Sequence, residues 1–306
     1  MYHYVREPGN TRYPAIKGRT LDEFHRQLDH LQAHYDLITA ETLMDAVAGQ
    51  GDLPEKAALL TFDDGYLDHF LHVLPILDAR GLQGSFFPVA GTVMEGRFLD
   101  VNRIHLILAG KPDLDEVVAW MRGWLARHRE KWPLLESWEK YWQRHARANR
   151  YDGAAIRFIK EMLQKGLPAP VRREILADLF AKYVSVDEKA IVAETYMNLE
   201  QIRMLTRMGM YVGCHGYDHE WMDAISPAAR EKDLDQARLF MEKEVGLALD
   251  DRWIMCYPYG GYDKGLMDLL QARGCAVGLT IDVGVADLTV HHPLALPRLD
   301  TNDLPS

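Results

Sequence analysis

Three short segments of the 306-residue chain carry the side chains that metal-assisted hydrolysis requires. Asp63 and Asp64 are adjacent carboxylates, so one can ligate a cation while the other accepts a proton. His215 and His219 lie four residues apart, a spacing that places two imidazoles on one side of a helical turn. Asp64, His215 and His219 together predict a two-histidine, one-carboxylate metal site that leaves coordination positions open for water and substrate.

Taken singly, each segment also has a plainer interpretation. An Asp-Asp-Gly sequence can be a solvated turn, and a pair of histidines can lie in a surface loop. The third segment, from Cys256 to Gly261, contains proline and glycine and can be a simple tight turn. The same backbone can instead aim an N–H group at a developing oxyanion. The three segments in this order are far more specific than any one of them.

Each segment follows a predicted buried strand. Residues 57–62 form a continuous apolar run of the kind found in parallel strands that are covered on both faces. Further strands are predicted at 84–89, 210–214, 253–256 and 275–280, and helices at 21–31, 67–80, 226–243 and 263–273. This alternation predicts βαβ units, and active sites of α/β barrels lie at the carboxyl ends of the strands.

The alternation stops between about residues 101 and 198, where the sequence predicts helix almost throughout. We therefore expect a discontinuous barrel over 1–100 and 195–306 and a helical insertion over 101–194. Five of the seven tryptophans lie in the insertion, and residues 121–150 hold eight Lys and Arg against three Glu. The aromatic residues can form the core of a small helical bundle. Alternatively, the insertion is a lid that walls the substrate cleft, with rings for sugars and arginines for an anionic group.

Composition excludes several classes of protein. A net charge of −10 argues against non-specific binding of nucleic acid, which needs a basic surface. Hydrophobic residues make up 48% of the chain, which excludes intrinsic disorder, and no apolar run is long enough to predict a membrane span. The three scattered cysteines and the lack of a signal-peptide pattern predict a cytoplasmic protein without a disulfide framework. Nothing in the sequence indicates an oligomeric state.

The three segments together resemble the motifs of the polysaccharide deacetylases, the NodB-homology family also called carbohydrate esterase family four. Thr61 to Gly65 is identical to the first motif of that family, His215 to His219 matches the second, and Tyr257 to Gly260 matches most of the third. The resemblance covers about 1–100 and 195–300. It implies a distorted (β/α) barrel, usually seven-stranded, that hydrolyses N- or O-acyl groups on sugars with a divalent metal.

The resemblance also implies a role for each matching residue. Asp63 would be the catalytic base, and the backbone N–H of Tyr259 would join the metal in the oxyanion hole. Tyr257 and Tyr259 are the candidate substrate contacts. Zn²⁺ is the expected metal, and its implied ligands are Asp64, His215 and His219.

The chain departs from the family pattern at two places. Cys256 stands where the third motif usually has the arginine that orients the base, and Arg298 is the candidate to supply that cation from the last strand. The late leucine-x-histidine motif, the source of the general acid in the family, has no clean match. His291 is the candidate acid, with His292 and His3 as alternatives.

The sequence thus predicts a metal-dependent hydrolase that removes an acyl group, with N-acetyl expected, from a sugar. The expected substrate is an intracellular precursor of a surface polysaccharide. Two alternatives stay open: an inactive module that only binds glycan, and a metal amidohydrolase with a non-sugar substrate. Asp63 argues against the first because a pure binder does not need that carboxylate, and the aromatic insertion favours sugars over the second.

Overall fold

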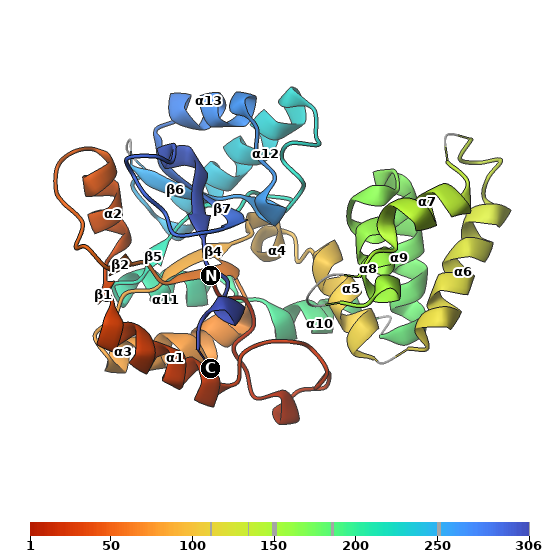
Figure 1. Cartoon of the computed structure of the whole chain (residues 1–306), viewed down its shortest axis with the longest axis horizontal. Coiled ribbons are helices and arrows are strands. Elements are labelled where there is room, and N and C mark those ends of the chain that lie inside the picture. Colours follow the sequence, from red (N-terminus) through yellow and green to blue (C-terminus); the bar gives the residue numbers. More distant parts are fainter. Residues whose placement is uncertain (111, 134, 149–151, 185–186, 250–251, 306) are drawn as a thin grey trace. The chain divides into compact units, whose positions relative to one another are not determined.

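The computed structural model describes the whole chain except residues 111, 134, 149–151, 185–186, 250–251 and 306. The described chain divides into two compact units (Figure 1). The first consists of Met1–Glu7, Gly18–Arg97 and Val192–Ser306, and the second of Pro8–Lys17 and Phe98–Ile191. The segment Pro8–Lys17 therefore groups with the helical insertion, whereas the sequence predicted that it belongs to the barrel. Within the described residues, no helix combines the length and the apolar character needed to cross a membrane.

The strands of the first unit pair in parallel and form three small sheets. One sheet has the order β1-β2, another β3-β4-β5, and the third β6-β7-β8. The α/β class predicted from the sequence is therefore confirmed. The strands are β1 (Asp36–Leu37), β2 (Ala57–Ala58), β3 (Thr61–Asp64), β4 (Ser85–Pro88), β5 (Tyr211–Val212), β6 (Trp253–Cys256), β7 (Cys275–Val283) and β8 (Leu296–Arg298).

Single contacts link the two larger sheets and their edges. Tyr2 forms a parallel bridge with Phe62 of β3, and Cys214, just after β5, forms one with Met255 of β6. The backbone nitrogen of Met1 donates to the carbonyl oxygen of Leu299, directly after β8, at 2.9 Å. Through these pairings, Tyr2 and the strands β3 to β8 follow one another as parallel neighbours. The described residues do not form one continuous closed sheet, so the seven-stranded barrel stays a prediction.

The apolar run at 57–62, expected to be one strand, is divided between two. Ala57 and Ala58 pair with β1, whereas β3 begins at Thr61 and pairs with β4. A continuous apolar run shows that the backbone is buried but not where it changes partner, which is why the sequence did not reveal the division. β3 also extends through Asp63 and Asp64, so both carboxylates belong to a buried strand.

Helices and aromatic residues fix β3 in place. Tyr2 stacks on Phe62 with ring centroids 5.2 Å apart, and Phe62 stacks on Phe86 of β4 at 4.8 Å. Phe24 contacts both Tyr2 and Phe62 by its edge. Burying each such ring contributes roughly 2–3 kcal/mol. The helices of this unit are α1 (Leu21–His34), α2 (Ala40–Val47), α3 (Leu74–Ala79), α4 (Ala90–Met94), α11 (Leu199–Arg207), α12 (Pro227–Leu239) and α13 (Lys264–Ala272).

The helix expected over 67–80 is irregular in its first half. A π-helical stretch, His69–Val73, precedes α3. Pro75 lies near the start of α3 and has no N–H to donate, so a regular helical ladder cannot pass through it. The π-helical stretch includes His69, which is buried and points its Nε2 atom at the backbone of His3.

The second unit is built from helices and carries the tryptophan-rich sequence. Trp124 is buried, and Trp138 and Trp142 pack against Phe158 at centroid distances of 4.9 and 4.7 Å. These contacts give three of the tryptophans a packing role within the unit. Whether the insertion walls the substrate cleft stays a prediction. The helices are α5 (Asp100–Ala109), α6 (Leu114–Arg127), α7 (Trp138–His145), α8 (Ala154–Glu161) and α9 (Ala169–Tyr183), and α10 (Glu188–Thr195) follows them in the chain.

Candidate active site

Three non-glycine residues with a positive φ angle mark the polar centre of the first unit. They are Asp64 (72°), His219 (54°) and Tyr259 (56°), and they are the only such residues in the described part of the chain. Each belongs to one of the three segments singled out from the sequence. A left-handed backbone at a non-glycine residue costs about 1–3 kcal/mol and persists where surrounding structure enforces it, most often at functional sites.

The three predicted metal ligands converge. The Nε2 atoms of His215 and His219 each lie 3.3 Å from the Oδ1 atom of Asp64, and all three side chains are buried. A tetrahedral zinc ion with ligand bonds of about 2.0–2.1 Å requires neighbouring ligand atoms about 3.3 Å apart. The donor atoms and their spacing therefore fit a divalent metal such as zinc.

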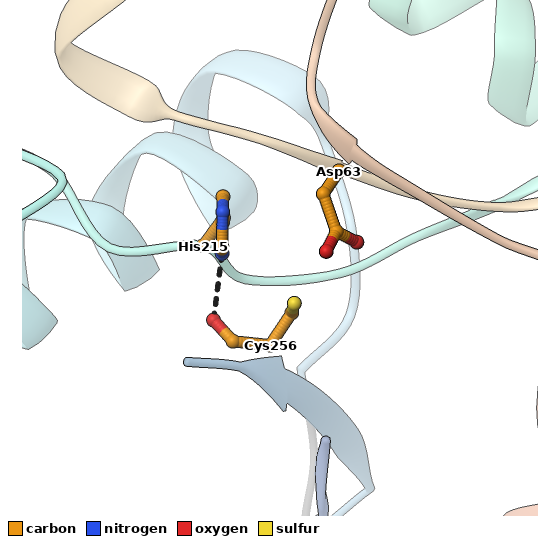
Figure 2. A group of neighbouring side chains, drawn as sticks. All are labelled: Asp63, His215 and Cys256. Carbon is orange, nitrogen blue, oxygen red and sulfur yellow. Dashed lines mark hydrogen bonds between the residues drawn. The ribbon is translucent and has the colours of Figure 1, made fainter. Parts of the chain in front are cut away.

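Hydrogen bonds orient two of these side chains. The Nδ1 atom of His215 donates to the backbone carbonyl oxygen of Cys256 at 2.7 Å (Figure 2). A carbonyl can only accept, so Nδ1 carries a proton, and Nε2 is the ring atom of His215 that is directed at Asp64 and available to a metal. The hydroxyl of Tyr66 donates to the Oδ2 atom of Asp64 at 2.6 Å. This arrangement, a ligand imidazole tied to a backbone carbonyl and a ligand carboxylate held by a hydroxyl, is typical of metal sites.

Asp63, the adjacent carboxylate, has a different partner. Arg298 binds it through two parallel hydrogen bonds, Nη1 to Oδ1 at 3.0 Å and Nη2 to Oδ2 at 2.8 Å. The Nε atom of Arg298 donates to the carbonyl oxygen of Thr280 at 2.8 Å, which fixes the guanidinium. Burial raises the pKa of Asp63, but the charge and hydrogen bonds of Arg298 outweigh this and hold that pKa well below its usual range. Asp63 is therefore an ionised, oriented acceptor.

A second group of potential ligands lies beside the first, formed by Asp63, His215 and Cys256 (Figure 2). Arg298 already occupies it, because its Nη2 atom lies 3.2 Å from the Cys256 sulfur and 2.8 Å from Asp63. Burial raises the pKa of the Cys256 thiol, although Arg298 acts in the opposite direction. A protonated thiol beside a fixed cation is a poor metal ligand, so Asp64, His215 and His219 are the better fit to a metal ion.

The histidine candidates for the general acid lie in different surroundings. His291 and His292 belong to the loop before β8, where their Nδ1 atoms accept hydrogen bonds from the backbone of Asp287 and Leu294. Both therefore support local turns. His3 instead follows Tyr2, which pairs with Phe62 of β3 and whose carbonyl oxygen accepts a hydrogen bond from the backbone N–H of Asp63 at 3.0 Å. The structure thus brings His3, and not His291, to the polar centre.

The two tyrosines of the third segment differ in burial. Tyr259 is half-buried, and its ring stacks on Trp221 at 4.8 Å and meets the edge of His219 at 4.5 Å. Tyr257 is completely buried, and its hydroxyl donates to the carbonyl oxygen of Leu294 at 2.7 Å. Tyr257 therefore has no exposed side-chain surface for a substrate, which corrects its assignment as a substrate contact.

Several residues of the site were not selected from the sequence. Tyr66 and His69 follow the first motif directly, and that proximity was the signal that could have revealed them. Trp221 lies two residues beyond His219 and could have been found in the same way. Asp233 of α12 binds the loop between the two histidine ligands, and nothing in the surrounding helical sequence distinguishes it.

Comparison with known proteins decides the family. The sequence pattern of the polysaccharide deacetylases matches residues 50–119 and 186–278, which is more than half of the chain. The chain belongs to the polysaccharide deacetylase family. The matched ranges include the adjacent carboxylates, His215 and His219, so the family resemblance and the convergent geometry concern the same residues.

Individual relatives of this family member match it to different extents. Poly-beta-1,6-N-acetyl-D-glucosamine N-deacetylase of Escherichia coli K12 is 33% identical over 88 residues, which cover 28% of this chain and 13% of that protein. The chain thus spans a small part of that relative. The Streptococcus pyogenes deacetylase PplD in complex with acetate aligns with a TM-score of 0.58 and 14% identity, over 97% of this chain and 88% of PplD. IcaB from Ammonifex degensii aligns with a TM-score of 0.54 and 20% identity, over 97% of this chain and 89% of IcaB. The two solved structures show a shared fold.

Proposed function

We propose that this member of the polysaccharide deacetylases is a metal-dependent hydrolase that removes an acetyl group from the nitrogen of an amino sugar. The observation that carries the proposal is that the two adjacent carboxylates have different partners. Asp63 pairs with a fixed cation, and Asp64 faces two histidines. The name of the Escherichia coli relative supports an N-acetylglucosamine unit as the group recognised. An intracellular precursor of a surface polysaccharide remains the substrate that we expect.

Asp64, His215 and His219 would hold the metal, and Zn²⁺ suits this set of nitrogen and oxygen donors. A divalent metal at this position supplies Lewis-acid activation of water and of the amide carbonyl. The chain must then provide a proton acceptor, a donor for the oxyanion and a proton donor for the leaving amine.

Asp63 is the proton acceptor in this proposal. Arg298 keeps it ionised and holds both carboxylate oxygens in one orientation. Because the pKa of Asp63 is lowered, it is a weak base and takes a proton only from a water molecule that has been made more acidic. This requirement agrees with a neighbouring metal site.

The other two roles belong to Tyr259 and His3. Tyr259 has a left-handed backbone and its ring meets the edge of His219, so its backbone N–H is the proposed donor to the oxygen of the attacked carbonyl. His3 would give a proton to the sugar nitrogen as the carbon–nitrogen bond breaks, leaving acetate and a free amine. His3 replaces His291 in this role because the Tyr2–His3 segment pairs with β3 directly beside Asp63.

The test uses the full chain, zinc and oligomers of N-acetylglucosamine. Wild type should retain one zinc per chain and release acetate. His215→Ala/His219→Ala should lose both properties, whereas the matched pair His291→Ala/His292→Ala, on an exposed loop, should keep both. Equal zinc content in wild type and His215→Ala/His219→Ala would refute the metal site.

The same assay separates the alternatives. Zinc retention and glycan binding without acetate release would indicate a binding module. Release of acetate from simple acetamides but not from the sugars would indicate a non-sugar amidohydrolase. His3→Ala should lower turnover without loss of zinc, and unchanged turnover in this variant would remove His3 as the acid.

A further inference from the structure

The loop that joins the two histidine ligands is held by a carboxylate from outside the three motifs. Asp233 of α12 accepts a hydrogen bond on Oδ1 from the backbone N–H of Tyr217 at 2.9 Å. Its Oδ2 atom accepts another from the N–H of Asp218 at 2.8 Å. Both oxygens of one side chain thus bind consecutive amides between His215 and His219.

The opposite side of the same loop is bound by α4. The N–H of Ala90 donates to the carbonyl oxygen of Gly216 at 3.2 Å, and the N–H of Gly91 donates to that of Tyr217 at 2.9 Å. The loop is therefore held through four backbone groups, two by Asp233 and two by the start of α4. Fixing these groups fixes the path of the backbone from one ligand to the other.

Two glycines permit this close approach. A Cβ atom on Gly216, whose φ is 72°, would lie 2.9 Å from the Oδ1 atom of Asp233. A Cβ atom on Gly91 would lie 2.6 Å from the carbonyl oxygen of Tyr217. Both distances are shorter than a carbon–oxygen contact allows, so the hydrogen bonds that hold this loop depend on these glycines as well as on Asp233.

Asp233 is a costly residue to keep at this position. Its side chain is only 4% exposed. Burial, together with the nearby charges of Asp218 and Glu220, raises its pKa to about 6 although two amides bind it. Two other charged residues of α12 have partners of opposite charge: Arg230 pairs with Asp263, and Asp235 accepts from Arg273. A buried carboxylate held mainly by amides reduces stability. We therefore expect Asp233 to contribute to function and not to the stability of the fold.

We propose that Asp233 is a positioning residue, which sets the separation of the His215 and His219 imidazoles by holding the loop between them. This inference rests on the proposed function, since it assumes that the two histidines bind a metal. Groups that orient metal ligands contribute about 10- to 100-fold to metal affinity or activity. Asp233 would contribute in this way without contacting the metal or the substrate.

The test is Asp233→Asn, with Asp235→Asn on the same helix as the matched control. Asparagine keeps the shape but turns an NH₂ group toward one of the two amides, so one hydrogen bond is replaced by a contact between two donors. Zinc affinity is measured by competition with a chromogenic chelator, and Co²⁺ absorption reports the ligand geometry. We expect zinc affinity about 10- to 100-fold weaker and an altered Co²⁺ spectrum in Asp233→Asn, a lower kcat with KM little changed, and no change in Asp235→Asn.

Each outcome bears on a different statement. Wild-type zinc affinity and an unaltered Co²⁺ spectrum in Asp233→Asn would overturn the positioning role while leaving the metal site intact. Failure of the wild-type chain to bind zinc would overturn the proposed function and the inference with it. If Asp233→Asn does not fold, Gly216→Ala provides the same comparison, because its Cβ atom would displace Asp233. Unchanged zinc affinity in Gly216→Ala would overturn the proposal.

Discussion

The two halves of the polar centre contain the same side chain in different surroundings. On one side, Asp63 is bound by a guanidinium that the chain itself supplies. On the other, Asp64 faces two histidines and a tyrosine hydroxyl. Neighbouring residues of a strand point to opposite faces, so each carboxylate meets its own set of partners. The difference teaches that the partner, and not the residue type, separates the proposed proton acceptor from the proposed metal ligand.

The largest effect is expected when the acceptor is removed. Asp63→Asn should lower kcat by about 10²- to 10⁴-fold, because the amide cannot take a proton. Zinc content should stay near that of wild type, since Asp63 is not a ligand in the proposed site. Asp64→Asn is the matched variant and should lose zinc. The comparison is made by acetate release and elemental analysis, and substantial activity in Asp63→Asn would show that the two carboxylates do not divide the work as proposed.

Removal of the cation should mainly affect stability. Arg298→Met leaves Asp63 buried and unpaired, which should cost about 3–5 kcal/mol in the free energy of unfolding. The double variant Asp63→Asn/Arg298→Met should be more stable than Arg298→Met, because the stranded charge is gone. The pKa of Asp63 is lowered in the fold, so the stabilisation from its pairing is present above about pH 4 and is lost as the pH falls further. Urea unfolding measures these differences, and strict additivity of the two substitutions would contradict the pairing.

Asp233 should show the opposite pH dependence. Its pKa is raised to about 6, from about 4 in an unfolded chain, so the folded state binds more protons between these values. Stability of the metal-free protein should therefore decrease as the pH rises from about 4 to about 6, by up to roughly 3 kcal/mol from this residue. Asp233→Asn should remove that part of the pH dependence. Identical pH profiles in wild type and Asp233→Asn would contradict it.

The smallest effect is expected from the tyrosine hydroxyl on the metal side. Tyr66→Phe removes the 2.6 Å hydrogen bond to Asp64 and keeps the ring. We expect zinc affinity to fall about tenfold, equivalent to about 1.4 kcal/mol. Tyr262→Phe, which removes an exposed hydroxyl bound to Asp282, is the control and should leave affinity unchanged. A larger loss in the control than in Tyr66→Phe would exclude the proposed orientation of Asp64.

Parts of the site could be predicted from the sequence because they are local. Asp63 and Asp64 lie in one short motif and the two histidines in another, and each motif follows a recognisable apolar strand. Arg298 could be named because the third motif lacked its arginine. The choice of His3 over His291 could not be made, because it depends on the Tyr2–His3 segment lying against β3. Asp233 could not be predicted from the sequence for a similar reason, since only the fold brings α12 to the loop that Asp233 binds.

The positive φ angles at Asp64, His219 and Tyr259 also affect how the sequence can evolve. At each position glycine would suit the backbone better, while the chemistry requires a side chain or a fixed N–H. Asp and His tolerate the left-handed region better than a bulky ring, so the conflict is greatest at Tyr259. In a randomised library, selection for heat resistance alone should enrich glycine or asparagine at residue 259, with a gain of about 1 kcal/mol. Selection for turnover should instead retain residues that keep the loop rigid. The two selections should therefore enrich different residues at position 259.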